Sequence, residues 1–100
     1  MKHITYLAEK EITESFQDDV LDIRLEIKDI RRIIKIDTFL NLTYLCFHAN
    51  KISKIEGLDK LVNLEIFYLS NNEITKIEGL NNLTNLHCLG LSENQITKIS

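Results

Sequence analysis

The sequence lacks proline and tryptophan, and it contains only two cysteines and three glycines among its 100 residues. Two cysteines are too few for the disulfide framework that holds many small secreted domains together, so a reducing compartment such as the cytoplasm is expected. No apolar run approaches the roughly 20 residues that a membrane-spanning helix needs. Residues 1–14 also lack the apolar centre of a secretory signal, which favours the same cytoplasmic location.

Strong charge and catalytic motifs are also missing. The net charge is −3, which gives no general attraction to nucleic acid or to an anionic membrane. We find no glycine-rich phosphate loop and no nucleophile placed beside a base, so the sequence predicts neither an enzyme nor a cofactor. Cys46, His48 and Cys88 could suggest a metal site. The repeat described next places Cys88 about 10 Å from the other two, which is too far for one zinc ion.

The sequence does contain a repeat of 22 residues. Asn50, Asn72 and Asn94 mark successive units, and each unit follows the pattern L-x-x-L-x-L-x-x-N-x-I-x-x-I-x-x-L-x-x-L. The apolar positions extend one unit backwards, where Lys28 takes the place of the asparagine. We therefore expect units at 20–41, 42–63, 64–85 and an incomplete one at 86–100. The first unit is degenerate, as terminal repeats often are.

The spacing within a unit predicts its local structure. The L-x-L portion alternates as a strand does, and the later apolar residues recur every third position, as in tight turns or 3₁₀-like segments. Stacked units would form an α/β solenoid, with a short parallel β-sheet on the concave side and 3₁₀ or loop returns on the convex side. The asparagines should bond turn backbone groups inside the bend, and Gly57 and Gly79 should serve backbone geometry.

Residues 1–19 fall outside the repeat. Their apolar residues recur near helical spacing, which predicts a capping helix over the first repeat. The residues that carry this prediction are Ile4, Leu7, Ala8, Ile12 and Phe16.

The units resemble the leucine-rich repeat family. The phrases "NKISKIEGLDKLVNL" and "NEITKIEGLNNLTNL" are similar to a 22-residue subclass typified by the regulatory subunit of protein phosphatase 1 and by ciliary or axonemal proteins. Bacterial surface repeats of similar period tend to carry proline where this chain has Glu56-Gly57 and Glu78-Gly79. The resemblance therefore implies a eukaryotic-type intracellular protein, with nuclear and ciliary locations as alternatives to the cytoplasm.

The resemblance also bears on the end of the chain. The last unit stops before its closing Leu-x-x-Leu, and the C-terminal cap of the subclass is missing. We expect either a piece of a longer protein or a homodimer formed through that end, because an uncovered terminal strand leaves backbone groups unpaired.

The strand residues between the inward leucines should face the concave side, which is the usual working surface of a solenoid. We therefore expect this surface to bind a protein partner, whose identity is unknown. We expect it to bind neither nucleic acid nor membrane. Its candidate residues are Arg24, Tyr44, His48, Ile66 and Tyr68. In the alternative hypothesis, the segment is a structural end of a longer solenoid with no partner site of its own.

Overall fold

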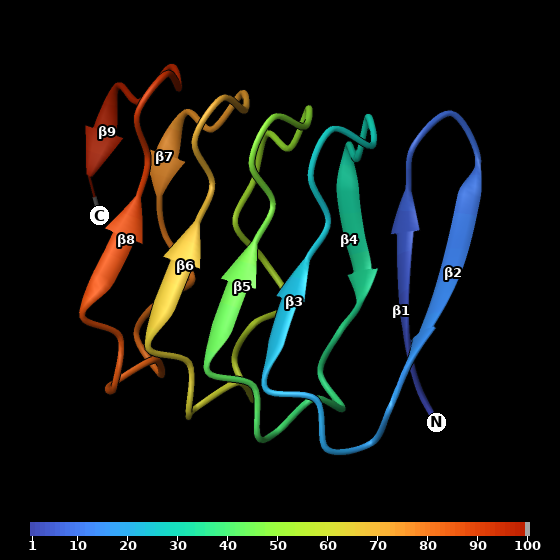
Figure 1. The fold of residues 1–100 in the computed structure, drawn as a ribbon. Helices are drawn as coiled ribbons and strands as arrows, with labels where there is room; N and C mark the ends of the chain where they lie inside the picture. Colours follow the sequence, from blue (N-terminus) through green and yellow to red (C-terminus); the bar gives the residue numbers. More distant parts are fainter. Residues whose placement is uncertain (100) are drawn as a thin grey trace.

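The computed structural model describes residues 1–99, so Ser100 of the predicted fourth unit lies outside the described residues. The described chain is a solenoid of strands and turns, called the coil below, and each of its repeat units forms one coil of it. The described residues contain no helix, and none of them could cross a membrane as a helix. Four short strands form a parallel sheet on one side of the coil (Figure 1). In order, they are β3 (Asp22–Arg24), β5 (Tyr44–Cys46), β6 (Ile66–Tyr68) and β8 (Cys88–Gly90).

The strands of this sheet pair residues that are 22 positions apart. Ile23 lies beside Leu45, Leu45 beside Phe67, and Phe67 beside Leu89. The predicted parallel sheet is therefore present, and its register equals the period of the repeat. Each unit adds one strand because its apolar residues can be buried only against the next unit.

The opposite side of the coil carries further strands and turns. The strands are β4 (Arg32–Lys35), β7 (Lys76–Ile77) and β9 (Lys98–Ile99), and β7 pairs with β9. The returns are successive turns in which Leu61 donates to the Leu58 carbonyl and Leu64 to the Leu61 carbonyl, both at 3.0 Å. Such i+3 to i bonds fit the apolar period of three, but each closes a single turn. The helical part of the predicted α/β class is therefore wrong.

The repeated apolar residues form one core between the two sides. Leu42, Leu45, Leu58, Leu61 and Leu64 are fully buried. The rings of Phe47 and Phe67 lie at 6.5 Å with an edge-to-face angle of 80° between the two coils that carry them. Burial of an apolar side chain contributes about 1.5–3 kcal/mol, so this continuous core is the main stabilising feature of the coil.

The asparagine column lies inside the bend, as the sequence predicts. The Asn72 amide donates to the carbonyls of Phe47 and Leu69, both at 3.0 Å, and its oxygen accepts from the Ile52 amide at 3.0 Å. Asn50 and Asn94 bond the equivalent groups of their own and the preceding coils. Each asparagine therefore ties its own coil to the preceding one through backbone groups that leave the sheet.

The prediction of an N-terminal helix is wrong. Residues 1–19 form a β-hairpin of β1 (Lys2–Leu7) and β2 (Glu11–Phe16), and β1 also pairs antiparallel with β4. The apolar residues satisfy two periods at once, and the period of two is the one realised, with Ile4, Tyr6 and Ala8 buried. Threonine, isoleucine and aromatic residues favour strands, and β4 supplies a partner strand that local spacing could not reveal.

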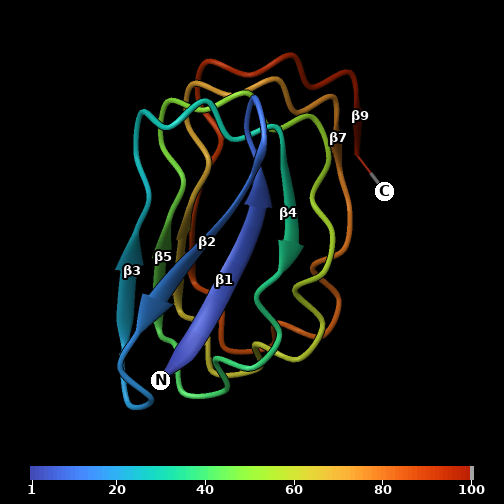
Figure 2. The same cartoon turned by 90° about the vertical axis from the view of Figure 1, so that its right-hand side faces the viewer.

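The hairpin covers one end of the coil. Figure 2 shows β1 and β2 lying across that end, between β3 and β4. Phe16 packs edge-to-face on Phe39 at 5.9 Å, and the Tyr6 hydroxyl donates to the Glu14 carboxylate within the hairpin. Burial together with this carboxylate raises the pKa of Tyr6 to about 12. The first repeat is therefore covered, as predicted, but by two strands and not by a helix.

Candidate protein-binding face

The outward side of the β3-β5-β6-β8 sheet, called the strand face below, carries all five candidate residues. Parallel pairing places Ile66 between Tyr44 and Cys88, and Cys46 between Arg24 and Tyr68. His48 follows β5 two residues after Cys46. Tyr44, His48, Ile66 and Tyr68 are half-buried, and Arg24 is exposed. The structure therefore brings the predicted residues onto one surface.

Arg24, Tyr44 and Tyr68 form a zigzag row across three strands. The Arg24 guanidinium carbon lies 4.5 Å from the centre of the Tyr44 ring, and the Tyr44 and Tyr68 rings meet edge-to-face at 5.7 Å. Guanidinium-to-ring and aromatic contacts each contribute about 0.5–1.5 kcal/mol. These contacts hold the three side chains in place. Burial raises the pKa of Tyr44 despite the nearby Arg24 charge.

Gly90 fixes where the Tyr68 ring can lie. A Cβ atom at Gly90 would come within 2.5 Å of Tyr68 Cδ1 and 3.4 Å of Ser70 Oγ. The ring therefore occupies space that any other residue at position 90 would fill. Sequence analysis missed this role, although an isolated glycine in a strand position is a signal of close approach by another group.

The two thiols of the strand face contact polar neighbours. Cys46 is buried and donates to a Glu26 carboxylate oxygen at 3.1 Å, and burial raises the pKa of its thiol. Cys88 lies 3.5 Å from the Tyr68 hydroxyl, and this contact raises the pKa of Tyr68. A neutral, buried thiol such as Cys46 is a weak nucleophile. Within residues 1–97, no group of three potential metal-binding side chains comes together.

The chain was compared with known proteins. The family model "Leucine Rich repeats (2 copies)" matches residues 40–82 and 62–100. Among solved structures, an internalin (inlF) from Listeria monocytogenes is similar, with a TM-score of 0.73 and 33% identity over 80% of this chain. This chain spans 24% of the internalin's length. The comparison with curated protein sequences gave no significant match.

The family model covers more than half of the chain, and the internalin structure shares the coil at substantial identity. These matches agree with the parallel strands spaced 22 residues apart and with the asparagine column inside the bend. The chain belongs to the leucine-rich repeat family.

Proposed function

We propose that the chain is a non-catalytic binding module that holds a protein partner on the strand face. The observation that carries this proposal is the Arg24–Tyr44–Tyr68 row. Tyrosine and arginine are the residue types that most often dominate binding energy at protein interfaces. Here they stand together on a surface made of paired strands, close to the half-buried Ile66.

Order in the free protein should favour binding. A flexible side chain costs about 0.5–1.5 kcal/mol when an interface immobilises it. The Tyr44 and Tyr68 rings already contact one another, and Arg24 already lies over Tyr44. Less freedom is then left to lose when a partner binds, so the row can contribute more of its contact energy to affinity.

The proposal is tested by capturing partners with the wild-type chain and with a variant carrying Tyr44→Ala and Tyr68→Ala. Both rings are only partly buried, so we expect the variant to fold, which circular dichroism would verify. Lys54→Ala, a change at an exposed residue outside the strand face, serves as the control. The proposal predicts a protein that the wild type and the control retain and the double variant loses. An unchanged set of captured proteins would show that the strand face is not the binding surface.

A second candidate function is structural. In the last coil, Leu86, Leu89, Leu91 and Ile96 are only partly buried, whereas Leu42, Leu45, Phe47 and Ile52 at the same positions of the second unit are buried. The chain also spans only 24% of the similar internalin. Both observations favour a segment that further repeats or a second copy would cover at this end. If the double variant captures the same proteins as the wild type, the result would support this alternative.

Finer assignments rest on the resemblance of the repeat alone. A phosphatase-regulatory role, a role in ciliary assembly and a cytoplasmic location stay predictions, and the similar internalin is a bacterial protein. A homodimer through the β8 and β9 end is likewise a proposal. Sedimentation of the purified chain over a range of concentrations would test it, and a mass that stays monomeric at all concentrations would contradict it.

A further inference from the structure

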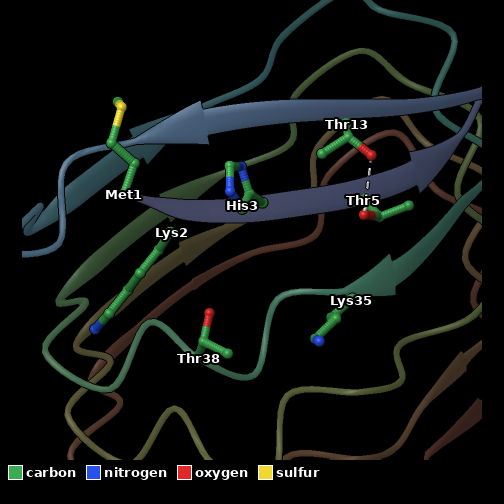
Figure 3. Close-up of a pocket in the computed structure, with 7 residues that line it drawn as sticks. All are labelled: Met1, Lys2, His3, Thr5, Thr13, Lys35 and Thr38. Carbon is green, nitrogen blue, oxygen red and sulfur yellow. Dashed lines mark hydrogen bonds between the residues drawn. The ribbon is translucent and has the colours of Figure 1, made fainter.

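A hollow of about 530 Å3 lies on the outer surface of the N-terminal sheet, away from the strand face. It is bounded by β1, β2, the end of β4 and the residues that follow β4. In Figure 3, Lys2, Thr38 and Lys35 lie along one side of β1, with Thr38 between the two lysines. None of the seven residues that line the hollow is acidic.

An irregularity in the sheet presents Lys35 to this hollow. Tyr6 pairs with Ile33, but the preceding residue of β1, Thr5, pairs with Lys35, so Ile34 is an extra residue in β4. Side chains alternate between the faces of a regular strand, which would place Lys35 on the inner side together with the buried Ile33. The bulge instead leaves Lys35 exposed beside Thr5.

The positive charge of the hollow is not neutralised by the described part of the chain. Among residues 1–97, no carboxylate lies within 4.0 Å of the Lys2 or Lys35 ammonium group. Two acidic residues of neighbouring segments contact other cations. Asp18 lies 3.2 Å from the amino group of Met1, and one oxygen of Asp37 lies 4.0 Å from Lys60, while its other oxygen is buried without a partner.

We propose that this hollow binds the phosphate group of a small phosphorylated molecule. Lys2 and Lys35 supply the charge, and the Thr38 hydroxyl donates from between them. A phosphate monoester carries about −1.5 to −2 charges near pH 7, which matches two ammonium groups. Its oxygens accept from several directions, which suits lysine donors placed on different strands. The volume falls within the roughly 300–1,000 Å3 of small-molecule sites.

The proposal is tested by titrating the isotopically labelled chain and following its backbone amide resonances. The probes are inorganic phosphate, ribose 5-phosphate and, as a planar anion, acetate, all at constant ionic strength. We expect saturable shifts at Lys2, Thr5, Lys35 and Thr38 with both phosphate probes, and none with acetate. Lys2→Gln and Lys35→Gln should each weaken binding by about threefold or more, which is typical of an exposed charge contact. Lys54→Gln should leave it unchanged.

Two results would overturn the proposal. In the first, acetate moves the same resonances as phosphate does, or Lys35→Gln leaves the phosphate shifts intact. In the second, inorganic phosphate binds but ribose 5-phosphate does not, which would exclude a small phosphate ester as the ligand. The amide spectra themselves report whether each variant keeps its fold. A failure of this site would leave the strand-face proposal untouched, because the two surfaces share no residue.

Discussion

At the scale of single residues, the asparagine column shows how a polar side chain can stabilise a buried bend. The Asn72 side chain is 6% exposed, yet its oxygen accepts one backbone hydrogen bond and its nitrogen approaches three carbonyls. The Ile52 amide leaves the sheet ladder, so without the Asn72 oxygen it would be buried without a partner. The same positions that identify the repeat therefore also hold adjacent coils together.

Asn72→Ala should lower the free energy of unfolding by roughly 2 kcal/mol. The change leaves the buried Ile52 amide without an acceptor, and a buried unpaired group costs about 1–3 kcal/mol, whereas the Phe47 and Leu69 carbonyls keep donors from Asn50 and Asn94. Chemical denaturation measures the loss. Asn81→Ala, at an exposed residue, should change the free energy by less than about 0.5 kcal/mol. Equal effects of the two changes would show that the column does not stabilise the bend.

Ile27 stands in a backbone conformation that β-branched residues avoid. Its φ is 55°, and one residue follows each strand at a similar angle in the later coils: Ala49, Asn71 and Glu93. The repeat therefore has a left-handed backbone conformation at this position in every unit. In the first unit the position is occupied by Ile27, whose side chain is 80% exposed. The backbone strain at Ile27 is therefore not offset by burial of its side chain.

Ile27→Asn should raise the free energy of unfolding by about 0.5–1 kcal/mol, because asparagine tolerates this conformation and no packing is lost. Leu21→Asn is the matched control, since Leu21 is also exposed but does not have a positive φ. It should have little effect. Thermal denaturation compares the two, and a destabilised Ile27→Asn would contradict the strain argument.

At the scale of elements, the N-terminal hairpin carries the most unusual titrating group. The Tyr6 pKa of about 12 lies above its ordinary value of 10.0 because of burial and the Glu14 carboxylate. The folded state therefore keeps the phenol protonated more strongly than the unfolded state does. This contribution to stability is complete below pH 10 and is lost as the pH rises through about 12.

The loss should amount to roughly 2–3 kcal/mol, since one pKa unit corresponds to about 1.4 kcal/mol. Tyr6→Phe should cost about 1 kcal/mol at pH 8 through the lost hydrogen bond, and it should flatten the decline of stability above pH 10. Urea denaturation of the wild type and the variant between pH 8 and 11.5 checks this expectation. Parallel declines in the two proteins would exclude Tyr6 as their source.

The strand face depends on one glycine. Gly90→Ala should displace the Tyr68 ring, because the added methyl group would lie 2.5 Å from its Cδ1 atom. Partner capture should then fall toward the level of Tyr68→Ala, while stability changes by about 1 kcal/mol or less because the ring is at the surface. Gly90→Ala with full partner capture would show that the position of Tyr68 does not matter.

The sequence predicts the strands, the inward residues and the outward row, because all of these follow from one repeated period. It fails where a contact does not follow from that period. Ile4, Leu7 and Ala8 satisfy helical spacing, but their partner strand β4 lies about 30 residues away in the chain. The contact of Tyr68 with Gly90 likewise needs coordinates, since spacing places residues on a face without showing which way a ring turns.

At the scale of the whole molecule, the coil is a support that presents one ordered surface. The hairpin covers the first coil, the asparagine column and the core hold successive coils in register, and the strand face is thereby kept in place. In the proposed function, specificity comes from the outward strand residues, since the inward ones are occupied by the core.

The most direct test places a photoreactive benzoylphenylalanine at Ile66, in the centre of the strand face, or at Val62, an exposed residue in the return turns. Each chain is irradiated in a lysate, and crosslinked proteins are detected by their increased mass. The account predicts a discrete adduct from position 66 and none from position 62. Adducts from position 62 alone, or the same adducts from both, would contradict it.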